Sequence, residues 1–357
     1  MSHGAATAEE RGEARCGPRT DPHARTLTVV PAEAGIHRPH RPPSGCARAL
    51  VAVAGAVCDR CRAVGPSALL RAIIAVRMNS HWEPPAALLM ETAFDAARSA
   101  GAVLMEEWRR ERLIQFKGDI DLVTDADRRS EETIVSLLRS RFPDHQILAE
   151  EGTTGGVLPE YRWIIDPLDG TTNYAHRYPH FCVSVALERA GSLLLGVVYD
   201  PIRDELFAAR AGGGAFLNGQ PVAVSSVDDL LKALLCTGFP YDRRLFGPSL
   251  ERWGYFVRRC QAVRRDGSAA LDMCYVAAGR FDAFWEDHLH PWDSAAGVLM
   301  VREAGGVVTD FHGGQVDIFA GEVVASNRLL HPAVLGGLAE LEPLLQEQGG
   351  RSVRRDR

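Results

Sequence analysis

Apolar residues recur with a helical period from Pro85 onward. They fall three or four positions apart and place one apolar stripe along residues 85–108, which predicts an amphipathic helix. The stripe consists of Leu88, Leu89, Ala93, Ala96, Ala97, Ala100, Val103, Leu104 and Trp108. A second stripe with the same spacing predicts a helix over 127–141, and a short extended piece over 121–124 separates the two helices.

Short apolar runs bounded by turn residues follow, and they predict strands. In the first half of the chain these runs cover 145–149, 162–166, 181–188, 194–200 and 204–209. In the second half, strands are predicted at 233–237, 262–265, 281–285, 306–309 and 322–325, and helices at 247–259, 268–278, 292–304 and 331–347. Helices and strands that alternate in this way imply layers of helix and sheet. The predicted fold class is therefore α+β in the first half and α/β in the second, stacked as a layered sandwich.

Four segments are expected from these patterns. Residues 1–78 are rich in Ala, Arg, Pro and Gly, carry no sustained period, and are predicted to be a weakly ordered extension. A flexible leader and a natural translation start at Met78 both account for them, and the second explanation is favoured. The remaining segments are an α+β domain over 79–214, an α/β domain over 215–347 and a frayed tail over 348–357.

Composition excludes several classes of protein. With 357 residues, of which 46% are apolar and 24% charged, the chain is large enough for a substantial core. A formal net charge of −6 argues against a general nucleic-acid binder. The apolar runs at 49–57 and 66–76 are too short to cross a bilayer. The eight cysteines lack the close spacing of a disulfide framework, and Cys58 and Cys61 have no second pair at zinc spacing, so a soluble cytoplasmic protein is expected.

The segment 163–173 carries the strongest chemical signal. An apolar strand runs directly into Asp166 and Asp169, and a glycine turn at Gly170 follows. Hard divalent cations prefer oxygen ligands, and two carboxylates this close in sequence can share one cluster of cations. Free backbone amides after the glycine turn are suited to an anion. The segment therefore predicts a combined site for divalent cations and a phosphate ester.

Four other segments also bring acidic side chains next to predicted strands or helices. They are 121–127, 150–151, Glu286 and 292–293. Each one alone is weak evidence, because acidic residues at strand ends are usually solvated or cap a helix. Asp127 and Asp293, for example, both stand where a helix is predicted to begin. Only the combination of these segments favours a catalytic site.

Five motifs occur in one order along residues 85–345. They are Asp121-Leu-Val-Thr-x-x-Asp127, Glu150-Glu151, Asp166-Pro-Leu-Asp-Gly-Thr-Thr-Asn173, Gly267-Ser-Ala-Ala-Leu-Asp272 and Pro291-Trp-Asp-x-Ala-Ala-Gly297. Together they resemble the inositol monophosphatase family, in its bacterial SuhB-type branch, and a match of five ordered motifs is highly specific. The resemblance implies a layered αβαβα sandwich of the inositol monophosphatase and sugar phosphatase type.

The resemblance implies a magnesium site. A first Mg²⁺ would be held by Glu150, Asp166 and the backbone carbonyl of Leu168, and a second by Asp166, Asp169 and Asp293. A third, weaker Mg²⁺ is expected beside Glu150. A carboxylate shared through Asp166 sets two cations about 3.5–4 Å apart, the separation at which the attacking and leaving oxygens of a phosphoryl transfer are both stabilised.

The resemblance also assigns catalytic and substrate-binding residues. Thr171, hydrogen-bonded to Asp127, would orient and deprotonate a metal-activated water, with Glu150 as the third catalytic residue. The amides of Gly170 and Thr171 would hold phosphate oxygens. The remaining substrate-binding residues are Asp169, Gly267, Ser268, Ala269, Glu286 and Asp293. Glu286 would accept hydrogen bonds from polyol hydroxyls and would repel a second phosphate.

Two positions near these motifs leave alternatives open. His288 stands where the family usually has glycine, and it either narrows the polyol pocket or points to solvent, the second being favoured. Lys117 lies just before the first acidic motif, as a lysine does in the family, and is either close to the site or solvated.

The predicted function is Mg²⁺-dependent hydrolysis of myo-inositol monophosphate to inositol and phosphate, with inhibition by lithium. A broader sugar- or nucleotide-phosphatase, acting on fructose 1,6-bisphosphate or NADP, is the alternative among enzymes. The resemblance also suggests a non-catalytic role as a protein partner of the transcription machinery, and a homodimer is typical of the family. No membrane partner and no direct nucleic-acid partner are expected.

Overall fold

The computed structural model describes residues 85–109, 115–116, 122–123, 125–150, 152–154 and 158–352. The extension predicted over 1–78, with both explanations for it, lies outside these residues. Lys117, Asp121, Thr124 and Glu151 also lie outside them. Among the helices of the described ranges, none combines the length and the apolar character that a bilayer crossing demands.

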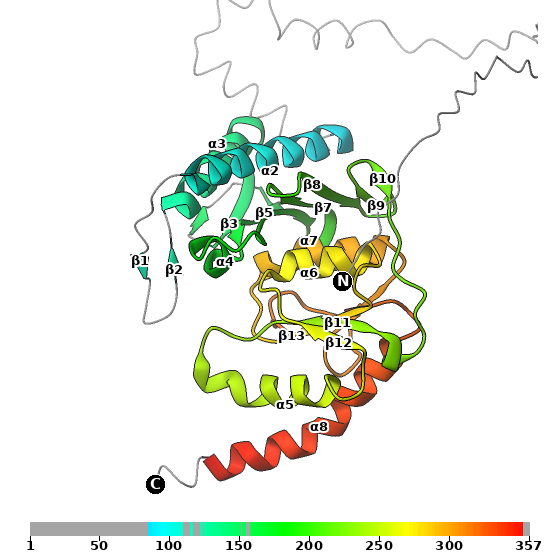
Figure 1. Ribbon diagram of the computed structural model, residues 1–357. Helices are drawn as coiled ribbons and strands as arrows, with labels where there is room; N and C mark the ends of the chain where they lie inside the picture. The colour runs from blue at the N-terminus through cyan, green and yellow to red at the C-terminus, as the bar shows by residue number, and fades with distance from the viewer. Residues whose placement is uncertain are drawn as a thin grey trace, which may run out of the picture. The chain divides into compact units, whose positions relative to one another are not determined.

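Two helices form the first layer of the fold (Figure 1). α2 (Ala86–Trp108) buries the apolar stripe predicted from its sequence, including Ala93, Ala97 and Leu104. α3 (Asp125–Arg141) packs beside α2, and both helices contact the same eight-stranded sheet. Because much of the buried stripe is alanine, α2 lies close to the strands beneath it.

The eight-stranded sheet follows the order β10-β9-β8-β7-β6-β5-β3-β4. Its strands are β3 (His145–Ala149), β4 (Thr153–Thr154), β5 (Leu158–Asp169), β6 (Cys182–Arg189), β7 (Ser192–Asp200), β8 (Glu205–Arg210), β9 (Gly214–Leu217) and β10 (Gln220–Pro221). All neighbours are antiparallel except β3 and β5, which run parallel. A separate antiparallel pair consists of β1 (Gln115–Phe116) and β2 (Leu122–Val123). The central strands are buried on both faces, so the sheet requires a second cover of helices.

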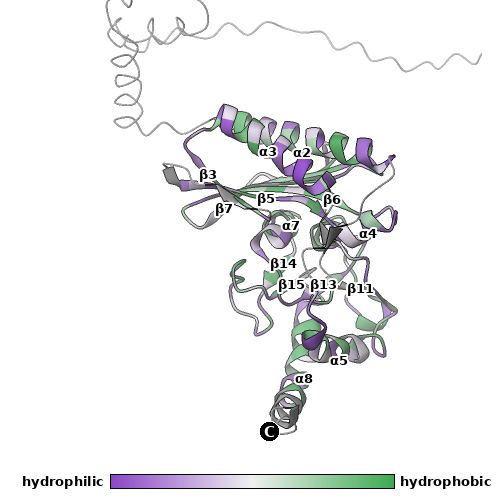
Figure 2. Ribbon diagram, turned by 90° about the vertical axis from the view of Figure 1, so that its left-hand side faces the viewer, coloured by the Kyte–Doolittle hydropathy of each residue, from purple (hydrophilic) through white to green (hydrophobic). Residues whose placement is uncertain are grey.

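Two helices supply this second cover and lie between the first sheet and another sheet (Figures 1 and 2). α6 (Ala269–Ala277) and α7 (Pro291–Glu303) pack against each other, and α7 contacts strands of both sheets. Gly196 of β7 comes so close to α7 that an added Cβ would lie 2.9 Å from Cα of Ala296. Helices that are buried on nearly every side belong in such an interior layer.

The second sheet has the order β12-β11-β13-β15-β14. Its strands are β11 (Leu234–Thr237), β12 (Ala262–Arg264), β13 (Ala283–Glu286), β14 (Val307–Thr309) and β15 (Val323–Ser326). β11 runs parallel to β12 and β13, whereas β15 pairs antiparallel with β13 and β14. α5 (Phe246–Phe256) and α8 (His331–Ser352) cover its outer face (Figure 2). The layers therefore stack as α, β, α, β, α, which confirms the predicted layered sandwich.

The structure differs from the prediction mainly at element ends. β5 continues through Pro167 to Asp169, because a register shift against β6 lets the chain bulge there. β9 and β10 have no counterpart in the prediction, since glycine and asparagine interrupt their apolar pattern, and they extend the first sheet to Pro221. α8 runs to Ser352, past the predicted end at 347 and into the predicted frayed tail, although Gly349 and Gly350 are poor helix formers. The domain boundaries at 78, 214 and 347 remain predictions.

A methyl group at Gly196 is expected to destabilise the fold. It would lie 2.9 Å from the Ala296 Cα and 3.0 Å from the Ala296 carbonyl oxygen, and the backbone of a buried helix has little room to move. Gly196→Ala should lower the free energy of unfolding by about 2 kcal/mol, measured by urea titration. Gly247→Ala is the control, because nothing lies within 4 Å of its added Cβ, and it should not lower stability. Equal stability of the two variants would contradict this close approach.

Candidate active site

The carboxyl end of β5 brings two predicted aspartates to one place. Asp166 pairs across the sheet with Ser184, and Asp169 pairs with Cys182, so the register of β5 against β6 shifts between the two aspartates. The resulting bulge places both carboxylates in one cavity. Asp166 Oδ1 accepts a hydrogen bond from the Leu168 amide at 2.9 Å, which stabilises the bulge.

Gly170 permits the sharp turn that follows the bulge and leads into α4 (Thr171–Ala175). Its φ of 95° lies in the left-handed region. An added Cβ would also lie 3.0 Å from the His180 carbonyl oxygen. Only glycine meets both requirements without strain, which gives the glycine of the motif a structural reason.

Four acidic side chains line one cavity of about 290 Å³, namely those of Glu150, Asp166, Asp169 and Asp293. Asp293 lies in the first turn of α7, and its Oδ2 accepts a hydrogen bond from the His290 amide at 2.7 Å. Asp293 therefore does cap its helix. Its side chain also lines the acidic cavity, so the same residue belongs to the acidic cluster.

The crowding of these carboxyl groups disfavours their charged forms. Burial raises the pKa of Asp166 well above its ordinary value, and the charges of Glu150, Asp169 and Asp293 raise it further. Burial and then the charge of Asp169 raise the pKa of Asp293 to about 7. Burial also raises the pKa of Asp169. A divalent cation removes this repulsion, and carboxylate oxygens beside a backbone carbonyl are donors that Mg²⁺ prefers, so these residues fit the predicted ion.

Asp169 is held in place by the start of α6. Its Oδ2 accepts hydrogen bonds from the Ser268 hydroxyl at 2.7 Å and from the Ala270 amide at 2.8 Å. The Cys182 thiol lies 3.7 Å from the same oxygen. The Ser268 hydroxyl, predicted to bind a polyol, is thus engaged in orienting a predicted cation ligand.

The predicted hydrogen bond between Thr171 and Asp127 is present. Thr171 Oγ1 lies 3.3 Å from Asp127 Oδ1 and 3.0 Å from the Leu168 carbonyl oxygen, and it can donate its proton to either. Asp127 is buried in the first turn of α3. Ser130 of the same helix donates a hydrogen bond to the Pro167 carbonyl at 2.7 Å. α3 therefore holds Asp127 against the bulge of β5.

A second cavity of about 280 Å³ shares Asp169 and Asp293 with the acidic one. It is lined by all four residues predicted to contact the polyol: Gly267, Ser268, Ala269 and Glu286. Burial and then the charge of Asp272 raise the pKa of Glu286 well above its ordinary value, while the positive charge of Arg265 opposes this rise. The two cavities together are lined by the predicted cation and polyol residues and by Thr171 and Glu150, while Asp127 lines neither and reaches the site through Thr171.

Three further residues of the second cavity belong to none of the sequence motifs. Tyr241 and Arg243 follow β11, and Arg265 follows β12. In α/β proteins, ligands bind beyond the carboxyl ends of parallel strands. β11 and β12 are parallel, so this rule is the signal that would have found these residues once the strand order was known.

A buried pair of ionisable side chains lies beside the acidic cluster. His180 Nε2 and Asp272 Oδ1 are 3.7 Å apart, and ligand atoms of these two residues and of Asp266 lie within 4.8 Å of one another. Burial lowers the pKa of His180, but the interaction with the nearby Asp272 carboxylate outweighs it and raises the pKa overall. Burial raises the pKa of Asp272 to about 6, against the opposing effect of His180. The positive charge of His180 acts to lower the pKa of Asp169 and so favours its ionised form.

His288 turns out to lie at the edge of the site rather than in it. Its side chain is half-exposed, and its Nδ1 lies 3.4 Å from Asp287 Oδ1. His288 lines neither of the two cavities. Its φ of 62° lies in the left-handed region, which explains why glycine is common at this position in the family.

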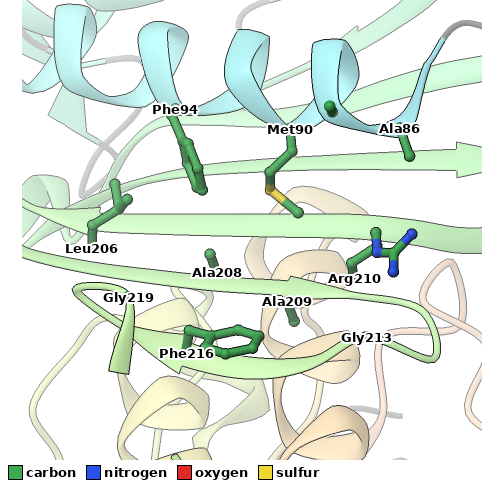
Figure 3. Close-up of a pocket in the computed structure, with 11 residues that line it drawn as sticks. Ala86, Met90, Phe94, Leu206, Ala208, Ala209, Arg210, Gly213, Phe216 and Gly219 are labelled. Carbon is green, nitrogen blue, oxygen red and sulfur yellow. The ribbon is translucent and has the colours of Figure 1, made fainter. Parts of the chain in front are cut away.

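Another cavity, of about 430 Å³, lies between α2 and the strands β8 and β9 (Figure 3). Met90 and Phe94 face Leu206 and Phe216 across it, and its one charged lining residue in the described ranges is Arg210. None of the predicted site residues lines this cavity. Because no pair of acidic side chains from the described ranges lines this cavity, it lacks the carboxylates that could hold divalent cations in the cluster at β5.

The stacked layers and the acidic cluster match the class of metal-dependent phosphatases that the motifs indicate. The chain belongs to the inositol monophosphatase family, whose model matches residues 87–342. The inositol-1-monophosphatase of Synechocystis sp. is 44% identical over 261 residues, which cover 72% of this chain and 91% of that protein. The Nus factor SuhB of Escherichia coli is 42% identical over 256 residues, which cover 71% of this chain and 96% of that protein. The crystal structure of the extragenic suppressor protein suhB from Bartonella henselae is similar with a TM-score of 0.68 and 40% identity, over 70% of this chain and 98% of that chain.

Replacing His288 by glycine is expected to stabilise the protein. The left-handed backbone costs histidine about 1–2 kcal/mol, and the greater entropy of unfolded glycine offsets part of this gain. His288→Gly should raise the free energy of unfolding by about 0.5–1 kcal/mol in a urea titration. His312→Gly is the matched control, because His312 is exposed and its φ is not positive, and this change should lower stability slightly. Loss of stability in both variants would contradict the strain at His288.

Magnesium and protons are expected to compete for the acidic cluster. In the absence of cations the folded state raises the pKa of Asp293 to about 7, so its contribution to stability is full below the ordinary aspartate pKa and is lost as the pH rises through about 7. The increase in Tm on adding Mg²⁺ should therefore be larger at pH 8 than at pH 6. The apparent affinity for Mg²⁺ should be about tenfold higher at pH 8 if one proton is displaced. An equal increase in Tm at both pH values would contradict this competition.

Proposed function

We propose that the protein hydrolyses myo-inositol monophosphate to inositol and phosphate in a Mg²⁺-dependent reaction. The observation that supports this most is the acidic cluster at the bulge of β5, which adjoins the pair Thr171 and Asp127 and a second cavity lined by Glu286. A phosphomonoester has a charged phosphoryl group and an alcohol. The two adjoining cavities offer a place for each of them.

The acidic cluster is proposed to hold two or three Mg²⁺. Glu150, Asp166 and the carbonyl of Leu168 would bind the first, Asp166, Asp169 and Asp293 the second, and Glu150 would lie beside a third. When bound, the cations supply positive charge for the phosphoryl oxygens and lower the pKa of water. The Ser268 hydroxyl and the Ala270 amide support this assignment, because their hydrogen bonds leave Asp169 one preferred orientation.

Thr171 and Asp127 are proposed to remove the proton from the attacking water. Thr171 Oγ1 would accept a proton from this water as its own proton passes to Asp127 Oδ1, 3.3 Å away. Asp127 is buried in α3, and Ser130 of the same helix is hydrogen-bonded to the bulge of β5, so Asp127 stays within reach of Thr171. Glu150 would be the third catalytic residue, since it lines the same cavity.

The substrate is proposed to lie across both cavities. The amides of Gly170 and Thr171 would donate hydrogen bonds to phosphate oxygens at the turn after β5. The alcohol would lie against Gly267 and Ala269, with hydroxyls bound to Glu286. Asp169 and Asp293 line both cavities and would therefore lie beside the bond that is broken.

Asp293→Asn is expected to abolish hydrolysis while leaving the fold intact. The change removes a carboxylate charge that Mg²⁺ needs but keeps an oxygen that can cap α7. Phosphate release from inositol 1-phosphate, followed during a Mg²⁺ titration, should fall by a factor of about 10³ or more. Asp310→Asn, at a half-buried position that lines neither cavity, should keep full activity and serves as the control. Undiminished turnover in an excess of chelator would refute the proposal.

A broader sugar- or nucleotide-phosphatase is the second candidate among enzymes. Arg243 and Arg265 line the second cavity, called the alcohol cavity from here on, and could accept an additional anionic group. Glu286 argues the other way because it repels a second phosphate. The same assay with fructose 1,6-bisphosphate and NADP separates the two candidates, since a preference for either substrate would overturn the role assigned to Glu286.

A role as a protein partner of the transcription machinery is the alternative from another class. It is supported by the name Nus factor SuhB that the Escherichia coli relative carries. The inactive Asp293→Asn variant tests it, because rescue of a deletion phenotype by this variant would give the binding role precedence. The resemblance also leads us to expect inhibition by lithium, a homodimer and a cytoplasmic location. The net charge of −6 argues against direct nucleic-acid binding.

A further inference from the structure

Tyr241 lies at the boundary between the acidic cavity and the alcohol cavity. Among the described residues, three line both the acidic cavity and the alcohol cavity: Asp169, Asp293 and Tyr241. The first two are proposed cation ligands. Tyr241 is the remaining one, and it brings a phenol to the boundary where phosphate and alcohol would meet.

Tyr241 lines both cavities although the residue is 58% exposed. A tyrosine phenol carries its proton at neutral pH, so it can donate a hydrogen bond at this boundary.

The loop that carries Tyr241 is held on both sides. After Tyr241, Asp242 Oδ1 accepts a hydrogen bond from the Arg244 amide at 3.0 Å and begins a short helical turn. Before it, the ring of Phe239 lies 5.8 Å from the Arg265 guanidinium and 5.8 Å from the ring of Phe246. These contacts hold the tyrosine over the cavities.

We propose that Tyr241 is a specificity-determining residue that selects phosphomonoesters of vicinal diols. Its hydroxyl donates a hydrogen bond to the substrate hydroxyl on the carbon next to the phosphorylated one. Glu286 accepts hydrogen bonds from hydroxyls farther along the alcohol cavity, so donor and acceptor together match a polyol. This inference rests on the proposed phosphatase function and adds the feature of the alcohol that the site recognises.

Three esters of one ring size test the assignment: cyclohexyl phosphate, trans-2-hydroxycyclohexyl phosphate and myo-inositol 1-phosphate. Tyr241→Phe removes only the hydroxyl. It should lower kcat/KM about five- to tenfold for the two esters with a neighbouring hydroxyl, mainly through a higher KM, and should change cyclohexyl phosphate less than twofold. Tyr178→Phe is the control, because Tyr178 is exposed and lines neither cavity, and it should leave all three values unchanged.

The outcomes of this test are distinct. An equal loss for all three esters would overturn the proposal, because the hydroxyl would then act on the ester itself or on the fold. No loss for any ester would overturn it as well. Equal Tm values for Tyr241→Phe and the parent protein exclude a folding defect. Absence of phosphate release from all three esters in the parent protein would instead refute the proposed function, and this assignment with it.

Discussion

Mutual repulsion among buried carboxylates is the constraint on which the site depends. Asp166, Asp169 and Asp293 share one cavity with Glu150. Charged groups in an interior are tolerated only when they are paired or bind a metal. Here no basic side chain lines the acidic cavity apart from the imidazole of His290 in the described residues. The cluster is therefore unfavourable by itself, and cations or protons must compensate for it.

The interior helices make this unfavourable cluster possible, because each carboxylate is held by a different element. The bulge of β5 orients Asp166, the start of α6 binds Asp169, and the start of α7 carries Asp293. α6 and α7 are buried between the two sheets, so their ends cannot move independently of the layers. Stability of the sandwich and precision of the site are thus consequences of the same packing. The alcohol cavity follows, since the loops after β11 and β12 complete it.

Much of the fold was predictable because the apolar period is regular. The stripe of α2 and the short apolar runs of β6 and β7 leave few alternatives for local structure. β9 and β10 escaped prediction because their own pattern is weak, and they form by pairing, β9 with β8 and β10 with β9. The contact of Thr171 with Asp127 joins residues 44 positions apart and was predicted from the family resemblance alone. Tyr241 and Arg265 belong to no motif, and only the parallel order of β11 and β12 places them at the site.

By itself the sequence determined most of the helices and strands and their order, and it predicted which acidic and hydroxyl side chains would carry the chemistry, because periodicity and motifs are local properties. The tertiary structure decided which contacts these side chains make and which cavity each of them lines. It shows that Ser268 binds Asp169, that His288 lies outside the cavities, and that Tyr241 stands between them. Such assignments depend on contacts between segments that are far apart in the sequence, and these segments meet only when the layers pack together.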